Sequence, residues 1–178
     1  DHDVPEGQNE KDNKEIRKWG KIPLFDFTPK DHLELTESLS QIDLESSSRI
    51  SGTRFMVLNK ELAKLHRALI QFMLDLHTVS HGYQEVYVPY IVSGQSLMGT
   101  GKFPKFGDDL FKIEGEKDLS FFPTAKVPVT NLLQNKILEP KDLPLKWLSH
   151  TPCFRSKSGS YGKDTRGILR LTQFEKFE

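Results

Sequence analysis

Residues 151–178, TPCFRSKSGSYGKDTRGILRLTQFEKFE, decide the fold of this chain. Apolar and polar residues alternate at both ends of the stretch, and a segment rich in Gly, Ser and Asp at 158–165 separates them. This pattern predicts two strands of one β-hairpin with a flexible tip. Arg155, Arg166 and Arg170 can converge on one anion there, because a guanidinium matches carboxylate and phosphate geometry. Solvent-facing strand arginines give the same spacing, so the pattern alone leaves both interpretations open.

A segment in the first half of the chain predicts one long amphipathic helix. Residues 60–82 carry apolar side chains at three- and four-residue steps; Asn59 can cap the helix start, and Gly82 can end it in a left-handed conformation. The expected apolar face consists of Leu62, Leu65, Leu69, Phe72, Met73 and Leu76. Upstream, residues 31–51 predict one or two short helices with Ser or Asp caps, and residues 52–59 predict a strand.

The other predicted strands are short and are joined mostly by turns. Residues 83–90 predict a strand that Pro89 stops or pushes to a sheet edge, because proline cannot donate to a ladder. Residues 110–124 predict strand, turn and strand around Gly115, and residues 127–138 predict a helix. Strands joined by hairpins imply an α+β fold with a largely antiparallel sheet flanked by helices. The strict strand–helix alternation of a doubly wound parallel sheet is absent.

Composition limits the possible functions. The chain has 178 residues, and its 25 Lys+Arg residues balance 25 Asp+Glu residues, so a nucleic-acid contact requires a local basic patch. The single cysteine, Cys153, excludes an internal disulfide and a cysteine-rich zinc site, which fits a cytoplasmic protein. No apolar run reaches the roughly 18 residues of a membrane span, so we expect no membrane partner. Residues 1–20 are polar and predict an arm or linker.

Two further patterns each have an ordinary structural explanation beside a functional one. His77 and His81 are four residues apart, but Thr78 stands where a zinc-protease helix has glutamate, so a solvated helix end explains them better than a metal. Thr124 lies between a strand and a helix start, where hydroxyl and N–H groups can meet a small polar ligand. An ordinary helix cap has the same pattern.

Taken together, these stretches resemble the catalytic domain of the seryl-tRNA synthetases, a family of class II aminoacyl-tRNA synthetases. SGTRF (51–55), GTGKFPKF (99–106), FFPTAKVPVTN (121–131) and the closing hairpin follow in the order that the family has. The resemblance implies a class II core over residues 21–178. Within it, the dimer-forming motif 1 would lie at about residues 60–89 and motif 2 at about residues 151–178, so a homodimer is expected.

The resemblance also implies the site residues and ligands. Arg155 would clamp the ATP α-phosphate and the serine carboxylate, stabilising the charge that builds as seryl-adenylate forms. The implied ATP-binding residues are Arg155, Ser156, Lys157, Leu171 and Phe174, the last stacked on adenine. The implied serine-binding residues are Thr124, Ala125, Lys126 and Glu178. Mg²⁺ would bridge the phosphates, the 158–165 loop would meet the tRNA(Ser) acceptor end, and no protein-held metal is expected.

The chain departs from the family pattern at two positions. Lys126 stands where the pattern Thr-Ala-Glu has a glutamate for the serine ammonium, and Lys157 stands where Phe-Arg-Ser-Glu has a glutamate of the ATP site. Like charges about 4 Å apart repel by roughly 4 kcal/mol at an effective dielectric near 20. We therefore expect weakened serine binding, and expect Lys126→Glu to restore it more than Lys157→Glu. Alternatively, Lys126 turns into solvent or pairs with a phosphate.

Two parts of the family pattern have no counterpart in the sequence, the N-terminal coiled-coil arm and motif 3, so we expect the sheet to be incomplete at its C-terminal end. The leading interpretation is a seryl-tRNA synthetase catalytic core, impaired in this form, that activates serine with ATP and transfers it to tRNA(Ser). The alternative is a non-catalytic, synthetase-like binding or regulatory protein. An unrelated nucleic-acid-binding α+β domain is the least favoured.

Overall fold

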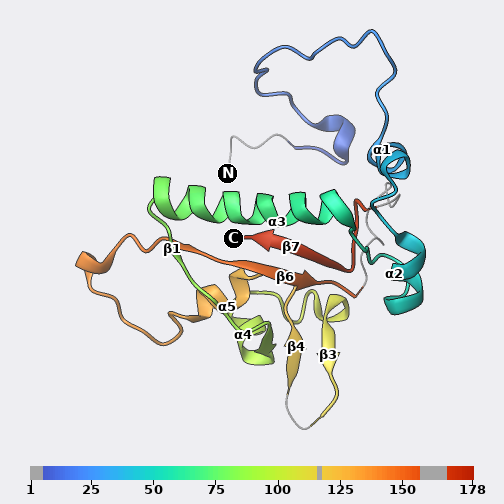
Figure 1. Cartoon of the computed structure of the whole chain (residues 1–178). Coiled ribbons are helices and arrows are strands. Elements are labelled where there is room, and N and C mark those ends of the chain that lie inside the picture. Colours follow the sequence, from blue (N-terminus) through green and yellow to red (C-terminus); the bar gives the residue numbers. More distant parts are fainter. Residues whose placement is uncertain (1–5, 116–117, 157–167) are drawn as a thin grey trace. The chain divides into compact units, whose positions relative to one another are not determined.

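The computed structural model describes residues 6–115, 118–156 and 168–178 (Figure 1). The chain divides into two compact units, Asp1–Asp31 and His32–Glu178. Within residues 6–31 the one described regular element is the 3₁₀ turn Glu10–Asp12, which Asn9 caps by accepting a hydrogen bond from the Lys11 N–H at 3.0 Å. None of residues 6–30 is buried, so these residues form no apolar core of their own.

The second unit begins with three helices. They are α1 (His32–Leu39), α2 (Leu44–Ser51) and α3 (Lys60–Asp75), and a π-helical turn, Leu76–Ser80, extends α3. Asp43 caps α2 by accepting the Ser46 N–H at 2.8 Å, as expected. Asn59 takes the N-cap position of α3 as expected, but its side chain makes no capping hydrogen bond, and the Gln41 amide oxygen accepts the Leu62 N–H at 2.8 Å instead. Gly82 follows the helix in the left-handed conformation, with φ of 68°.

In the described part of the chain, three small sheets complete the unit. Strands β2 (Ile91–Ser93), β4 (Leu119–Phe121) and β3 (Phe111–Ile113) form an antiparallel sheet in that order, and β6 (His150–Phe154) pairs antiparallel with β7 (Gln173–Phe177). The third sheet is a short parallel pair of β1 (Gln84–Glu85) and β5 (Trp147–Leu148). The α+β prediction and the closing hairpin are confirmed, and the strands of the 110–124 prediction form as β3 and β4.

Two predicted strands are wrong in extent. Residues 52–59 contribute only an isolated bridge between Ile42 and Leu58. The 83–90 prediction is reduced to the two residues of β1, and β2 begins only after Pro89, which has no N–H to donate. In both segments the β-favouring residues find no long partner edge, and local propensity alone does not make a strand.

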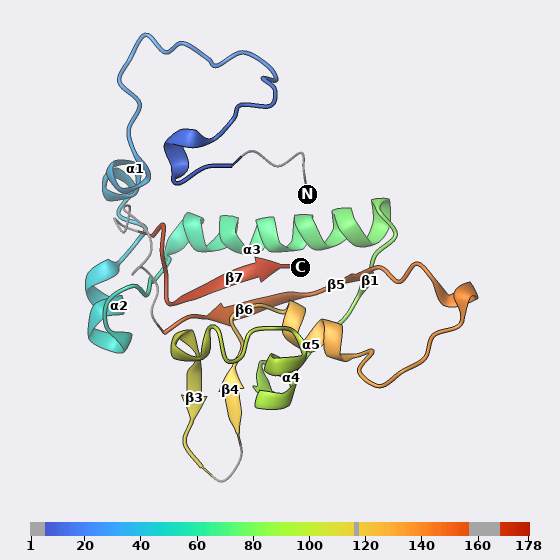
Figure 2. The same ribbon diagram turned by 180° about the vertical axis from the view of Figure 1, so that it is seen from behind.

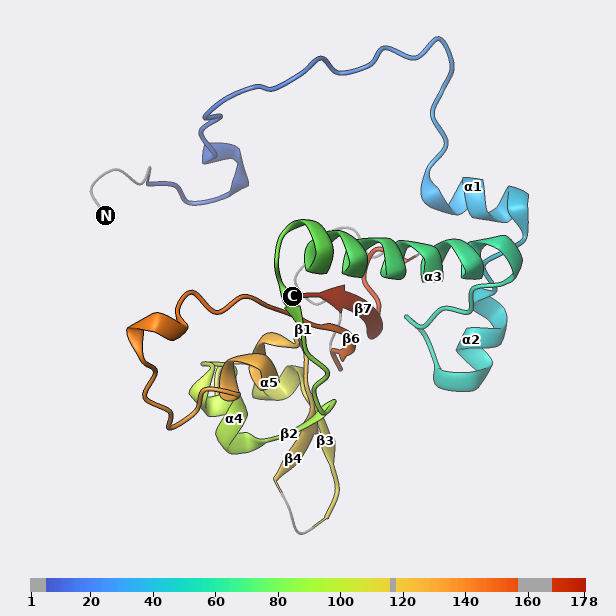
Figure 3. The same ribbon diagram turned by 60° about the vertical axis from the view of Figure 1, so that its left-hand side comes forward.

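The core lies where β4, the helix that follows it and the closing hairpin meet (Figures 2 and 3). Phe122, Ala125, Val127 and Cys153 are fully buried there with Leu97 from α4 (Gly94–Gly99), and Val127 belongs to α5 (Lys126–Asn131). The Phe154 N–H donates to the Phe122 carbonyl at 3.1 Å, which ties the end of β4 to the end of β6. This junction fixes the chain on either side of the site described below.

Helix α3 lies beside β7 in all three ribbon views (Figures 1 to 3). The six predicted apolar residues share one side of α3, and the chain leaves most of that side uncovered. Leu62 and Met73 are half-buried, whereas the other four are exposed, namely Leu65, Leu69, Phe72 and Leu76. Together with Val79, these four follow three- and four-residue steps along an uncovered stripe. Among the residues that the structure describes, no helix has the length and apolarity to cross a membrane.

Candidate active site

One cavity of about 560 Å³ gathers most of the predicted site residues. Thr124 and Lys126 enter it from the junction of β4 and α5, and Arg155, Leu171 and Phe174 enter it from the closing hairpin. The other described lining residues are Lys102, Phe106, Asp109, Leu110, Pro123, Ile168, Leu169, Arg170 and Lys176. Among the described lining residues, the charged side chains are five cations and one carboxylate, that of Asp109.

The alternation of β7 explains why one end of this cavity is charged. Phe174, Lys176 and Glu178 are two residues apart, so their side chains leave the hairpin on the same face. Phe174 lies opposite Cys153 and Lys176 lies opposite Thr151 in the hairpin register. Thr124 and Ala125 lie between β4 and α5, and Ala125 is fully buried in the core, so its backbone holds Thr124 and Lys126 beside this face.

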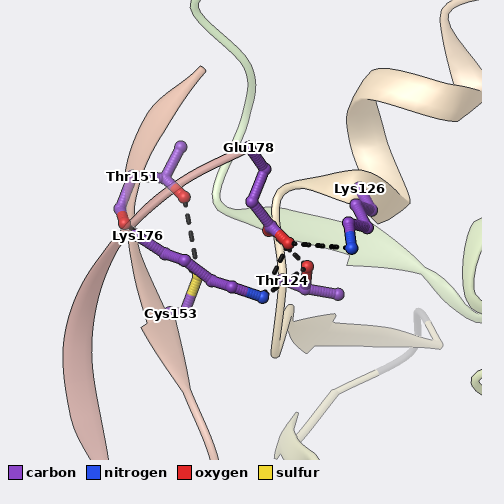
Figure 4. Close-up of polar contacts among 6 residues, drawn as sticks. All are labelled: Thr124, Lys126, Thr151, Cys153, Lys176 and Glu178. Atoms are coloured by element: carbon purple, nitrogen blue, oxygen red, sulfur yellow. Dashed lines mark hydrogen bonds and ion pairs between the residues drawn. The ribbon is translucent and has the colours of Figure 1, made fainter. Parts of the chain in front are cut away.

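At this end, three side chains surround the Glu178 carboxylate, whose side chain is only 4% exposed (Figure 4). The Thr124 hydroxyl donates a short hydrogen bond to Glu178 Oε2. Lys176 Nζ lies 2.6 Å from Oε1 and Lys126 Nζ lies 3.7 Å from the same oxygen. Lys176 also reaches the Thr124 hydroxyl at 3.4 Å. Glu178 is therefore neutralised from within the chain.

The electrostatics of Glu178 follow from these contacts. Burial alone raises the pKa of this carboxyl, but hydrogen bonds from Lys176 and Thr124 and the charge of Lys176 outweigh it, so the pKa lies below its ordinary value. Glu178 is therefore ionised at neutral pH. Nearby, burial raises the pKa of the Cys153 thiol, which is fully buried and stays protonated.

The other end of the cavity is built around Arg155. Its backbone N–H donates to the Thr172 carbonyl at 2.8 Å, which continues the hairpin one residue beyond β6. Its guanidinium lies 5.1 Å from the centre of the Phe174 ring, within the range of a cation–π contact. The Phe174 ring aligns the guanidinium and leaves its N–H groups free of that contact.

Four predicted site residues do not line the described cavity. Glu178 contacts Thr124, Lys126 and Lys176, which line it, but is not itself a lining residue. Ala125 is in the core and does not line the cavity. Ser156 points away, since its hydroxyl donates to the Asp108 carbonyl at 2.9 Å and its N–H to the Asp109 carbonyl at 3.0 Å. Lys157 lies outside the described residues, as do Arg166 and the 158–165 loop, so the predicted convergence of three arginines is described only for Arg155 and Arg170, both of which line the cavity.

Sequence reasoning missed two parts of the site. Lys176 is the nearest cation to Glu178, and its alternation with Phe174 and Glu178 was the signal that could have identified it. Phe106 lies on the cavity wall, with the ammonium groups of Lys102 and Lys105 at 5.5 and 5.4 Å from its ring centre. Aromatic and basic residues alternate in that segment, a pattern common where nucleotides bind.

The paired histidines on the extension of α3 have an ordinary role. His77 Nδ1 and His81 Nδ1 lie 2.9 Å apart, which is a hydrogen bond between one protonated and one unprotonated nitrogen. Among the described residues, no group of three or more His, Cys, Asp or Glu side chains could hold a metal ion. The hydrogen bond between the two histidines therefore stabilises the end of the helix.

Comparisons with known proteins place relatives beside this chain. The family model of the tRNA synthetase class II core domain (G, H, P, S and T) matches residues 110–178, which contain both ends of the cavity. Serine–tRNA ligase from Hahella chejuensis is 57% identical over 178 residues, covering 100% of this chain and 42% of that relative. The ligase from Coxiella burnetii (strain Dugway 5J108-111) is 54% identical, covering 99% of this chain and 42% of that relative.

Solved structures point the same way. Seryl-tRNA synthetase from Pyrococcus horikoshii complexed with ATP superposes with a TM-score of 0.88 at 37% identity, covering 98% of this chain and 43% of that one. The cytoplasmic serine–tRNA ligase of Naegleria fowleri in complex with AMP has a TM-score of 0.84 at 27% identity, covering 95% of this chain and 40% of that one.

These matches define a class II aminoacyl-tRNA synthetase fold. Within that class the chain belongs to the seryl-tRNA synthetase family. It spans about two-fifths of the length of the curated relatives that it matches.

Proposed function

We propose that the chain forms the part of a serine–tRNA ligase that binds ATP and serine, makes seryl-adenylate and passes the seryl group to tRNA(Ser). The observation that carries this proposal is the cavity itself. Its wall carries a guanidinium stacked on an aromatic ring at one end and, at the other, the Thr124 hydroxyl, which is hydrogen-bonded to the buried Glu178 carboxylate. ATP and a small hydroxylated amino acid would occupy these two ends.

Arg155 would bind at the reacting atoms. In adenylate formation a serine carboxylate oxygen attacks the ATP α-phosphorus, an O–P bond forms, and the bond to pyrophosphate breaks. Negative charge builds on the phosphoryl oxygens, and a preorganised guanidinium stabilises it most in the transition state. Because Phe174 already aligns Arg155, little reorganisation is needed when the nucleotide arrives.

The rest of the nucleotide would lie along the hairpin. Phe174 offers a ring for stacking on adenine, and Leu171 adds apolar contact on the same wall. Ser156 and Lys157 are included among the proposed ATP-binding residues because they follow Arg155 in the sequence, and not because of a described contact. The tRNA acceptor end would approach from the side of the 158–165 loop and accept the seryl group on its terminal ribose.

Mg²⁺ would bind together with the ATP triphosphate. The described cavity wall supplies one carboxylate, Asp109, among five cations, which does not fit a protein-held metal. Mg²⁺ prefers a few carboxylates together with water and phosphate oxygens. Its ligands here would therefore come mainly from ATP, and we assign no step of the chemistry to it.

We further propose that α3 forms a homodimer interface. The compartment that we propose for this protein is the cytoplasm. The stripe of Leu65, Leu69, Phe72 and Leu76 is between 36% and 61% exposed, and such a continuous apolar surface on a helix marks an association face. Sedimentation of the chain at tens of micromolar should show a dimer. Phe72→Glu should give a monomer, whereas a monomer of the unaltered chain would contradict the proposal.

Serine-dependent exchange of pyrophosphate into ATP tests the proposed activity. We expect little exchange from the 178-residue chain alone, and measurable exchange when these residues replace the matching segment of the Hahella chejuensis ligase. Arg155→Ala in that hybrid should abolish exchange. A hybrid that binds ATP and serine but shows no exchange after Lys126→Glu would refute the catalytic proposal.

A second candidate function has one observation in its favour. Lys126 stands 3.7 Å from the carboxylate that a substrate ammonium would need, so the site suits a synthetase-like protein that binds a different ligand without activating serine. Exchange activity of the hybrid with Lys126 unaltered would exclude this alternative.

A further inference from the structure

The cavity wall carries an aromatic ring to which the proposed binding of ATP and serine gives no role. Phe106 lines the cavity and is 40% exposed. It comes from the segment between α4 and β3, whereas Phe174, the ring proposed for adenine, comes from the closing hairpin. The described part of the cavity wall therefore has two aromatic rings, which separate parts of the chain contribute.

Two lysines place their charge beside the Phe106 ring. The ammonium groups of Lys102 and Lys105 lie 5.5 and 5.4 Å from the ring centre, within the range of a cation–π contact. Among the residues that the structure describes, neither lysine forms an ion pair. An exposed ring with cations beside it is typical of sites for single-stranded nucleic acid, where a base stacks on the ring and the cations contact the backbone.

Backbone hydrogen bonds fix this segment on the core. The N–H groups of Lys102 and Phe103 donate to the carbonyl of Leu97, which is buried in the core, at 2.9 and 3.3 Å. The Phe106 N–H donates to the Lys102 carbonyl at 3.0 Å. The Phe103 ring packs so closely on Gly107 that a Cβ there would lie 3.3 Å from it. The Phe106 ring is therefore positioned before a ligand arrives.

The same segment lies next to the end of the strand that leads into the 158–165 loop. The Ser156 hydroxyl donates to the Asp108 carbonyl at 2.9 Å, and the Ser156 N–H donates to the Asp109 carbonyl at 3.0 Å. Phe106 precedes these two carbonyls by two and three residues. An RNA strand that arrives from the side of this loop would therefore meet the Phe106 ring.

We propose that Phe106, with Lys102 and Lys105, binds the 3′-terminal nucleotide of the tRNA. The terminal base stacks on the ring, and the two ammonium groups bind the phosphates next to it. The adenine of ATP is assigned to Phe174 instead, because that ring has the Arg155 guanidinium 5.1 Å from its centre. The identity of the RNA as tRNA rests on the proposed function, whereas the binding of a terminal nucleotide rests on the contacts of Phe106.

Two short RNAs that form a tRNA acceptor stem are matched probes, one ending in CCA and one lacking the terminal adenosine. Fluorescence anisotropy measures the binding of each RNA to the 178-residue chain. The RNA ending in CCA should bind about tenfold more tightly, the effect of one stacked base. Phe106→Leu should remove this difference, and Phe106→Tyr, which keeps a ring, should retain it. Equal binding of the two RNAs by the unaltered chain, or binding of neither, would overturn the proposal.

Lys102→Gln and Lys105→Gln test the phosphate contacts. Each change should weaken the binding of both RNAs and lower the dependence of affinity on salt, because fewer counterions are released. Lys112→Gln is the matched control, since Lys112 is exposed on β3 and is not among the described residues that line the cavity. Equal losses from all three changes would show that net charge alone attracts the RNA, and would overturn the assignment of the two lysines.

Steady-state kinetics of the hybrid ligase separates this inference from the proposed function. In Phe106→Leu the KM for tRNA(Ser) should rise about tenfold, and it should rise more than the KM for ATP in the exchange reaction. If the KM for ATP rises as much, or the KM for tRNA(Ser) stays the same, the inference fails alone. If the unaltered hybrid shows no exchange, the proposed function fails, and the comparison of the two RNAs still decides whether Phe106 binds a terminal nucleotide.

Discussion

The two ends of the cavity differ in whether their charged groups are paired with other residues of the chain. At the Glu178 end a buried carboxylate has all its partners inside the chain, two of them on the far side of the sequence at Thr124 and Lys126. At the Arg155 end the guanidinium rests on the Phe174 ring, and among the described residues it forms no ion pair. A charge satisfied internally contributes to folding, whereas a charge left without an ionic partner is available to a ligand. Removing the Arg155 charge should therefore mainly lower ligand affinity, whereas removing the Glu178 charge should mainly lower the free energy of unfolding.

The largest effect should come from Arg155→Ala, measured as ATP affinity. A hydrogen bond to a charged group contributes about 1.5–3 kcal/mol, so affinity should fall about 10- to 100-fold. The free energy of unfolding should fall by no more than about 1 kcal/mol, since an exposed cation–π contact is worth little. Arg49→Ala is the control, because Arg49 donates hydrogen bonds to Glu45 and Ser46 within α2 and is not among the described residues that line the cavity. A loss of stability without a loss of affinity would reverse the roles of the two ends.

Glu178→Gln should have the next largest effect, measured as the free energy of unfolding in urea. The amide cannot neutralise Lys176 and Lys126, so we expect a loss of about 2 kcal/mol, less than for a fully buried pair because both lysines are partly exposed. Glu45→Gln, which removes an exposed pair with Arg49, should cost less than about 0.5 kcal/mol. Equal effects of the two changes would show that the Glu178 end is not a structural cluster.

The sequence predicted the hairpin and which of its side chains share a face. It did not predict that contacts within the chain neutralise Glu178. Alternation in residues 173–177 specifies which side chains share a face, so Phe174, Lys176 and Glu178 were predictable as neighbours. The contact between Lys126 and Glu178 was not, because it depends on how the β4–α5 junction packs on the hairpin through Ala125 and Cys153. Local patterns carry no information on that packing.

The same limit left open whether the apolar face of α3 is core or surface. Three- and four-residue spacing shows that a helix is amphipathic, but it does not show which part of the apolar surface the same chain covers. Leu65 and Phe72 are left exposed, while Leu62 and Met73 are half-buried. Residues 52–59 failed as a strand for a related reason, since strand formation needs a partner edge that the sequence does not reveal.

Acid should affect the Glu178 end selectively. The folded-state pKa of Glu178 lies below its ordinary value, so its contribution to stability is present above the unfolded-state pKa and is lost as pH falls through the lower folded-state pKa. The loss should begin near the ordinary glutamate pKa of about 4.3 and continue below it. Urea unfolding over this range should show a steeper decline for the unaltered chain than for Glu178→Gln. Parallel declines would mean that other carboxylates account for the acid sensitivity.

The smallest effect on folding should come from Lys126→Gln. Its side chain is 71% exposed and 3.7 Å from Glu178, and exposed pairs of this kind contribute at most about 0.5–1 kcal/mol, so the free energy of unfolding should change by less than about 0.5 kcal/mol. Lys176→Gln should cost more, because Lys176 is closer to the carboxylate and less exposed. A loss above about 1 kcal/mol for Lys126→Gln would place Lys126 among the structural partners of Glu178. A near-zero change would show that this lysine does not contribute to the fold.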